Sequence, residues 1–262
     1  MAADPAILAH LEEHGYAVVP DALSAEQVAV LREGVERAFA APDEESTLRG
    51  ESMARIWRPR MFERGTAFEE VVDNPRLIDL VEAVLGADCH LIANSALRTG
   101  PGDGISGWHA DEVVRFPRPR DVPLDPRIRV PCLILGINYY LCDVDDELGP
   151  TQFVPGSHRS GRGPEPEDFD AEGNPHYEGR GPLSGAGAAG TAVLWNDQTW
   201  HRGATNVSAD RTRWVLQAPY GRRWIAQRFW PFVSYRLPES VLQRANPRRQ
   251  RLLGCHGFGA YG

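Results

Sequence analysis

The sequence contains no lysine, and all 28 of its basic residues are arginine. Catalysis through a lysine Schiff base and nucleotide binding through a Walker-type lysine are therefore excluded. Alanine, glycine, proline and arginine are abundant, and we interpret this composition as a bias toward GC-rich codons.

Cysteine is also scarce, with four residues, and none of them has C-x-x-C spacing. This scatter indicates neither a zinc ribbon nor a disulfide framework, and it predicts reduced thiols in a cytoplasm. The N-terminus carries acidic residues where a signal peptide needs cations, and no apolar run approaches the roughly 18 residues of a membrane span. We expect a cytoplasmic protein with no membrane partner.

Basic charge is in deficit, because 36 acidic residues outnumber the 28 arginines and give a net charge of −8. A nucleic-acid partner is not expected, since phosphate binding needs a basic excess. The 42% hydrophobic content is ordinary for a globular protein with a sizeable core. A length of 262 residues fits one β-rich domain, so we predict a single domain over residues 1–262.

Helical patterns dominate the first third of the chain. Residues 5–15 predict a short helix that Asp4 caps, and residues 24–39 predict a longer one. The longer helix begins with a capping box, in which Ser24 is followed three residues later by Gln27. A third amphipathic helix is predicted over residues 75–85, before Gly86.

After Gly86 the pattern changes to short β-branched and aromatic runs between turn residues. The runs cover residues 89–99, 130–141, 151–155, 191–195 and 211–221. Strands that follow one another without helices favour an antiparallel sandwich or jelly roll. The polar, Gly- and Pro-rich segment 160–190 is predicted to be an inserted loop that acts as a lid.

The stretch "WHADE" holds His109 and Asp111 two residues apart, on one face of a strand. This spacing alone is a weak signal for a metal site. His201, where an apolar run meets a turn, adds a second histidine. Two histidines and a carboxylate form the facial triad of Fe(II) oxygenases. Arg211 and Arg213 follow, share a predicted strand face, and could bind a carboxylate-bearing cosubstrate.

Four motifs, in order, resemble the phytanoyl-CoA dioxygenase family of Fe(II)/2-oxoglutarate-dependent oxygenases. They are "HLEEHGYAVVPDALSAEQVAVLRE", "GWHADE", "GPTQFVPGSHRSG" and "HRGATNVSADRTRW". The resemblance implies a mainly β double-stranded β-helix, a cupin-like jelly roll, with N-terminal helices packed on one sheet.

Site residues also follow from the resemblance. It implies that His109, Asp111 and His201 are metal ligands. The cosubstrate arginine falls on Arg213, but the family often has it eleven residues after the second histidine, and Arg213 is twelve after His201. An insertion at Ala209 would reconcile the spacing, and Arg211 stays an alternative. Two further residues are implied to contact the cosubstrate, namely Thr151 and, more weakly, Asn94.

The implied function is an oxygenase that uses Fe(II), 2-oxoglutarate and O2 to hydroxylate an unactivated C–H bond of a small molecule, with secondary-metabolite tailoring favoured. Succinate and CO2 would be released. Desaturation, epoxidation or ring formation would use the same triad. The carboxylate of Asp111 argues against a halogenase. A zinc hydrolase and an inactive jelly-roll binding module remain as alternatives.

Several other residues can be assigned either a structural role or a functional one. His158 is expected in a structural turn, and the arginine runs around Trp57 and after Asp111 are expected to be solvated. The functional alternative places Trp57, Arg115 or Arg118 at the substrate entrance. A further set of aromatic residues is expected in the core or in pocket walls: Trp195, Trp200 and Trp224.

Overall fold

The structure is a computed structural model that describes residues 3–111, 118–122, 124–125 and 127–257. Its strands are β1 (Tyr16–Val19), β2 (Trp57–Pro59), β3 (His90–Leu91), β4 (Ser95–Thr99), β5 (Ile105–His109), β6 (Ile134–Tyr140), β7 (Thr151–Phe153), β8 (Leu183–Ser184), β9 (Ala192–Asn196), β10 (His201–Gly203), β11 (Arg213–Gln217) and β12 (Tyr220–Gly221). Its α-helices are α1 (Pro5–His14), α2 (Ala25–Ala40), α3 (Glu44–Leu48), α4 (Glu51–Ile56), α5 (Thr66–Val71), α6 (Ile78–Leu85), α7 (Glu239–Arg244) and α8 (Pro247–Leu252).

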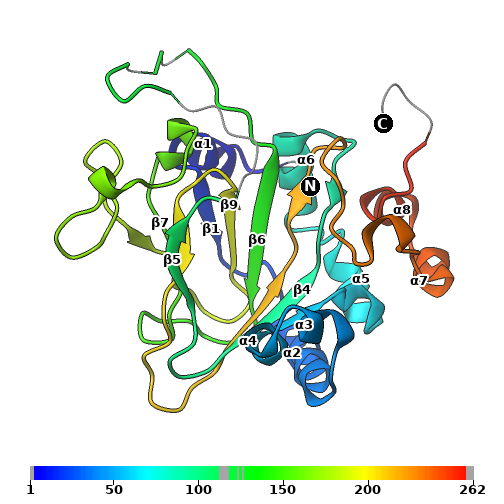
Figure 1. Ribbon diagram of the computed structural model, residues 1–262. Coiled ribbons are helices and arrows are strands. Elements are labelled where there is room, and N and C mark those ends of the chain that lie inside the picture. Colours follow the sequence, from blue (N-terminus) through cyan, green and yellow to red (C-terminus); the bar gives the residue numbers. More distant parts are fainter. Residues whose placement is uncertain (1–2, 112–117, 123, 126, 258–262) are drawn as a thin grey trace.

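The strands form two antiparallel sheets that face each other (Figure 1). The larger sheet has the order β1-β9-β6-β11-β4-β2, with β12 and β3 attached beside β6, and the smaller sheet has the order β5-β10-β7-β8. Sequence-distant strands are neighbours in both sheets, as in a jelly roll. The predicted mainly β double-stranded β-helix with flanking helices is confirmed.

Successive side chains of each strand point to opposite faces of the larger sheet, so each face carries its own hydrophobic cluster. Leu135 and Ile137 belong to the cluster that also holds Leu31 and Val35 of α2, so this face of the sheet packs against helices. Val193 and Val215 belong to the cluster that fills the space between the sheets. The N-terminal helices therefore pack on the larger sheet, as predicted, and the smaller sheet covers its other face.

Local signals at the N-terminus place the first helices as predicted. The Asp4 side chain accepts a hydrogen bond from the Ala6 amide, and Gly15 ends α1 in the left-handed conformation at φ 80°. Both hydrogen bonds of the Ser24–Gln27 capping box are present at the start of α2. The third predicted helix is α6, which starts three residues later than the predicted residue 75.

Three expectations are corrected by the structure. The run 89–99 is two strands, because the chain leaves the sheet between Leu91 and Ser95. Arg58 is buried rather than solvated, since its guanidinium donates to the Ala38, Ala54 and Ala41 carbonyls. Trp224 is 60% exposed and so is not a core residue.

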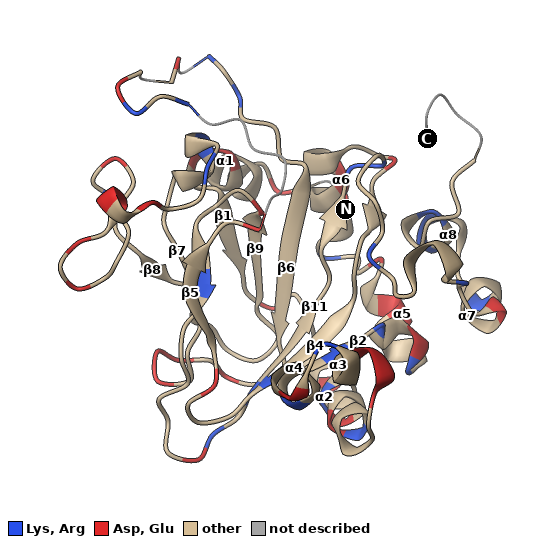
Figure 2. Cartoon of the chain, viewed as in Figure 1, with Lys and Arg blue, Asp and Glu red and all other residues tan. Residues whose placement is uncertain are grey.

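Charged side chains lie mainly on helices and connecting segments (Figure 2). Among the helices of the described ranges, none has the length and apolarity that crossing a bilayer requires. A cytoplasmic location and the lack of a nucleic-acid partner stay predictions.

Candidate metal centre

The smaller sheet brings His109 and His201 together. His109 is the last residue of β5, His201 is the first of β10, and the two are register partners in an antiparallel pair. Their ring centroids are 4.4 Å apart. Asp111 is the second residue after β5, and its amide donates a 2.9 Å hydrogen bond to the Asp197 carbonyl. The strand ends thus gather three potential metal ligands at one end of the jelly roll.

The three side chains converge on one point. Asp111 Oδ1 lies 3.4 Å from His109 Nε2, and Asp111 Oδ2 lies 3.3 Å from His201 Nε2. One ligand atom from each residue falls within 4.8 Å of the others, and among the described residues this is the group of His, Cys, Asp and Glu side chains that could hold a metal. His201 is buried, whereas the Asp111 side chain is 41% exposed. One side of the cluster is therefore accessible.

Backbone carbonyls fix the orientation of both imidazoles. His109 Nδ1 lies 2.7 Å from the Gly107 carbonyl oxygen, and His201 Nδ1 lies 2.8 Å from that of Thr199. A carbonyl can only accept, so each Nδ1 donates, and each Nε2 is the nitrogen that faces Asp111. Nε2 donates to the carboxylate when the ring is protonated and offers a lone pair to a metal when the ring is neutral. A hydrogen bond of this kind from the distal ring nitrogen is typical of metal-binding histidines.

The electrostatics of the cluster favour a charged carboxylate. Burial alone would raise the pKa of Asp111, but hydrogen bonds from His109 and His201 outweigh it and hold that pKa well below its usual range. The hydrogen bond with Asp111 is also the main cause that raises the pKa of His109. Two neutral imidazole nitrogens and one carboxylate are a donor set that fits Fe(II). Ala110, which lies between His109 and Asp111 in the chain, packs against a hydrophobic cluster and not toward the three ligand atoms.

Arg213 extends a cation from the larger sheet toward the strand of His201. It is buried, its Nε donates 3.0 Å to Thr99 Oγ1, and its Nη2 would lie 3.3 Å from a Cβ atom at Gly203. Among the described residues, its Nη1 has no hydrogen-bond partner. Burial lowers the pKa of Arg213. A buried guanidinium with an unused N–H fits a ligand carboxylate.

Arg211 lies outside β11 and points elsewhere. Its guanidinium donates to Asp145 at 2.8 and 3.0 Å and to Glu147 at 3.0 Å. The side chain is 41% exposed. The expectation that Arg211 and Arg213 share a strand face is therefore wrong, because the strand begins only at Arg213.

Thr151 lies close to the ligand strand, whereas Asn94 does not. Thr151 is buried, opens β7, and is the register partner of Gly203. The Asn94 side chain accepts a hydrogen bond from the Phe62 amide and donates one to the Gln217 carbonyl. The polar atoms of the Asn94 side chain thus bond the backbone of two other chain segments, and the structure does not place Asn94 beside the triad.

Sequence reasoning missed polar residues on the inner face of the larger sheet. Asn138 donates 3.4 Å to Thr151 Oγ1 and accepts 3.1 Å from Gln217 Nε2, and Tyr140 donates 2.9 Å to the Gly185 carbonyl. Alternation within the predicted strand 130–141 places residues 138 and 140 on one face, and this was the available signal.

Aromatic side chains border the metal centre. Trp195 packs 5.1 Å from the His201 ring, and its buried Nε1 has no hydrogen-bond partner among the described residues. Trp200 is fully buried on the other face of the small sheet. Both are wall or core residues, as expected. Trp57 packs against the cluster between the sheets, which keeps it a candidate for the substrate entrance.

The remaining sequence candidates lie away from the triad. The Arg118 guanidinium donates 2.8 Å to the Tyr177 hydroxyl, and Arg115 lies outside the described residues. His158 is buried in the short 3-10 helix Ser157–Ser160 with its Nε2 3.2 Å from the Glu12 carbonyl, in agreement with a structural turn.

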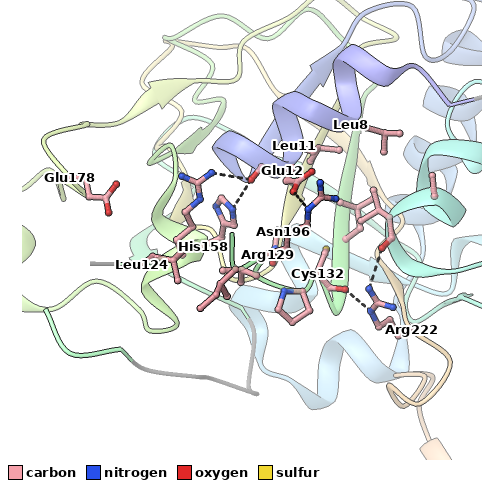
Figure 3. Close-up of a pocket in the computed structure, with 17 residues that line it drawn as sticks. Leu8, Leu11, Glu12, Leu124, Arg129, Cys132, His158, Glu178, Asn196 and Arg222 are labelled. Carbon is pink, nitrogen blue, oxygen red and sulfur yellow. Dashed lines mark hydrogen bonds and ion pairs between the residues drawn. The ribbon is translucent and has the colours of Figure 1, made fainter. Parts of the chain in front are cut away.

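A pocket of about 680 Å³ opens between α1, α6 and residues 128–132 (Figure 3). Leu135 and Asn196 line it from the helix-covered side of β6 and β9, so the sheet separates this pocket from the triad. Two arginines also line the pocket, but both are already paired. The Arg222 guanidinium donates to backbone carbonyls, and the Arg129 guanidinium forms an ion pair with Glu12. We place the functional centre at the triad, because the ligand atoms converge there.

Comparison with known proteins gives the family of the chain. A family model described as phytanoyl-CoA dioxygenase matches residues 11–214. The chain is 26% identical over 265 aligned residues to dioxygenase af480 of Aspergillus fumigatus, with 96% of this chain and 77% of that protein covered.

Solved structures share the fold. HygX from Streptomyces hygroscopicus, crystallised with nickel and 2-oxoglutarate, has a TM-score of 0.66 at 17% identity, covering 87% of this chain and 90% of that one. SnoN, an α-ketoglutarate-dependent epimerase from nogalamycin biosynthesis, has a TM-score of 0.62 at 22% identity, with 84% and 85% covered. SnoK, a carbocyclase from the same biosynthesis, has a TM-score of 0.63 at 20% identity, with 94% and 92% covered.

Proposed function

Since the chain belongs to the phytanoyl-CoA dioxygenase family, we propose that it is an Fe(II)- and 2-oxoglutarate-dependent oxygenase that hydroxylates an unactivated C–H bond of a small molecule. The observation that carries this proposal is the convergence of two imidazole Nε2 atoms and the Asp111 carboxylate in a jelly roll whose opposite sheet supplies a buried arginine. The metal ligands are His109, Asp111 and His201.

Different residues of the chain would bind the metal and the cosubstrate. The triad would hold the metal through two imidazole nitrogens and one carboxylate. Bound iron would supply the activation of O2 that oxidises 2-oxoglutarate to succinate and CO2. Arg213 would bind the far carboxylate of 2-oxoglutarate through its unused Nη1, and Thr151 lies beside this path. Arg211 is not part of this site in our proposal.

The surroundings of the triad favour a dry, oriented site. Phe153 and Trp195 pack against His201 at ring-centroid distances of 6.4 and 5.1 Å, so water has little access from that side. The carbonyl hydrogen bonds at each Nδ1 hold the rings in place before any ligand arrives. The free Trp195 N–H is a donor for an oxygen atom of a bound molecule.

A small-molecule substrate from secondary metabolism is supported by the structural neighbours. HygX has been crystallised with hygromycin B, and SnoN with nogalamycin RO. Because SnoK is a carbocyclase of the same fold, ring formation is the second reaction that we consider for this chain. The chain would act as a single domain over residues 1–262.

The test is binding followed by turnover. Anaerobic addition of Fe(II) and 2-oxoglutarate to the metal-free protein is expected to produce a visible charge-transfer band, and a matching small molecule is expected to stimulate succinate release. A zinc hydrolase would turn over without 2-oxoglutarate, and an inactive binding module would release no succinate. Absence of the band after chelation and reloading would overturn the proposal.

A further inference from the structure

The residues that immediately precede the three proposed ligands lie in one cluster. Trp108 precedes His109, Ala110 precedes Asp111, and Trp200 precedes His201. Trp108, Ala110 and Trp200 pack together with Val154 and Tyr177. Since neighbouring strand residues point to opposite faces, this cluster covers the back of the sheet whose inner face carries the ligands.

Tyr177 reaches this cluster from the inserted segment. Its backbone N–H and C=O both pair with Arg180 at 3.0 Å, which closes a tight turn with Glu178 at φ 49° and Gly179 at φ 75°. Two consecutive positive φ values are typical of the rigid two-residue hairpin turn. The Tyr177 ring meets Trp200 edge-on at 5.7 Å and 78°. The turn therefore presents this ring in a fixed position.

Two further contacts tie the insert to the ligand segments. The Trp200 indole N–H donates 2.7 Å to the Arg162 carbonyl, and the Arg162 guanidinium stacks over the same ring at 5.1 Å. Arg118, seven residues after Asp111, donates 2.8 Å to the Tyr177 hydroxyl. The insert thus contacts both Trp200, the residue before His201, and Arg118.

The ladder between the two histidine-bearing strands, β5 and β10, is short and irregular. Between β5 and β10 only His201–His109 and Gly203–Ile105 are in register, with an irregularity between them. A short, irregular ladder leaves the relative position of the two histidines poorly fixed by backbone hydrogen bonds. The cluster on the outer face joins residues beside both strands and so supplies further contacts between them.

We infer that the part of the insert from residue 160 to residue 182 buttresses the metal centre, and that Tyr177 is a positioning residue for all three proposed ligands. The inference rests on the proposed function. It differs from the predicted lid, because a lid acts on the substrate side of the metal, whereas Tyr177 acts from behind the ligand strands through Trp108, Ala110 and Trp200.

The test compares Tyr177→Ala with Tyr235→Ala. Tyr235 is a matched control: its ring also packs against an aromatic residue, Phe229 at 5.2 Å, and its hydroxyl also has a side-chain partner, Glu63 at 2.7 Å. Co(II) is the probe, read by calorimetric affinity and by its visible ligand-field spectrum. Tyr177→Ala is expected to weaken Co(II) binding about 10- to 100-fold and to change the spectrum. Tyr235→Ala should do neither.

Two more variants complete the design. Tyr177→Phe keeps the ring and should retain Co(II) affinity within roughly threefold, since it removes one hydrogen bond. Tyr177→Leu serves if the alanine variant does not fold, and an intermediate loss of affinity is expected from it. Equal Co(II) affinity and spectra for the wild type and the folded Tyr177 variants would overturn the buttress. If the wild-type protein itself binds no Co(II), the proposed function fails instead.

Discussion

His201 faces His109 across the pair formed by the edge strand β5 and its neighbour β10 in the small sheet, with 4.4 Å between their ring centroids. Each ring donates through Nδ1 to a carbonyl two residues earlier in its own chain segment, so both Nε2 atoms are presented to Asp111 in the same way. The two histidines are thus equivalent in their hydrogen bonding although only one of them is buried.

This equivalence predicts equal consequences for the loss of either histidine. His109→Ala and His201→Ala should each lower Fe(II) or Co(II) affinity by more than about 100-fold, which exceeds the effect of losing an outer-shell partner. Succinate release should stop in both. His10→Ala, at an exposed position of α1, is the control and should bind metal normally. Continued turnover by His109→Ala would refute the ligand assignment.

The two candidate arginines make opposite predictions. Arg213→Gln removes a buried cation with an unused N–H, and the KM for 2-oxoglutarate should rise at least about 30-fold, equivalent to about 2 kcal/mol. Arg211→Gln removes exposed ion pairs with Asp145 and Glu147, which contribute little, so its KM should stay within about twofold. Steady-state kinetics with varied 2-oxoglutarate decides between them, and a reversed pattern would restore Arg211 as the clamp.

A third prediction concerns His158 and the pH dependence of stability. Burial lowers the pKa of His158 to about 4, whereas the unfolded chain has the ordinary value of 6.5. Its buried Nδ1 has no hydrogen-bond partner among the described residues, so no acceptor is placed to stabilise a second proton on the ring. Between pH 6.5 and 4 the unfolded state binds more protons, and the free energy of unfolding falls as the pH is lowered.

The size of this effect follows from the shift. One pH unit within that window costs at most about 1.4 kcal/mol from this residue. His158→Gln keeps a donor for the Glu12 carbonyl and removes the titration, so its free energy of unfolding should vary less between pH 6.5 and 4 than that of the wild type. Urea unfolding at several pH values measures the free energy of unfolding of both proteins. The difference between the two proteins at each pH removes the contribution of the carboxylates, because both proteins contain the same ones. Parallel pH profiles would contradict the assignment.

Local sequence signals predicted the parts of this fold whose contacts are local. Asp4, Ser24 and Gln27 act within three residues of themselves, and α1 and α2 begin where they indicate. The triad could be predicted only because His201 lies in a motif with a known companion, since nothing local ties it to His109. Arg213 could not be separated from Arg211 by spacing, because the start of β11 is set by pairing with β4.

The features that the sequence did not predict depend on contacts between residues far apart in the chain. Arg58 appears in an arginine-rich run, yet three carbonyls at the ends of α2 and α4 bury it. Asn138 and Gln217 form a polar pair between strands whose pairing is long-range. The role of the insert was equally hidden, since Tyr177 meets Trp200 only after the sheet has folded. Such contacts depend on tertiary packing, which single-sequence periodicity does not carry.

The last prediction tests how the larger sheet supports the centre. Trp195 lies across Gly136 of the neighbouring strand, and a Cβ atom at Gly136 would lie 2.5 Å from the indole. Gly136→Ala must therefore displace Trp195, which is buried against His201. Overpacking of this kind costs about 1–3 kcal/mol, so the thermal midpoint should fall, and Co(II) affinity should fall with it.

Gly107→Ala is the matched control, because no atom of the described residues other than its chain neighbours lies within 4 Å of a Cβ atom there, although Gly107 belongs to the strand that ends in His109. Its thermal midpoint and Co(II) affinity should both match those of the wild type. If Gly136→Ala loses stability while Co(II) affinity is unchanged, then Trp195 supports the fold without constraining His201, and the wall that it forms matters only to the molecules bound beside the metal.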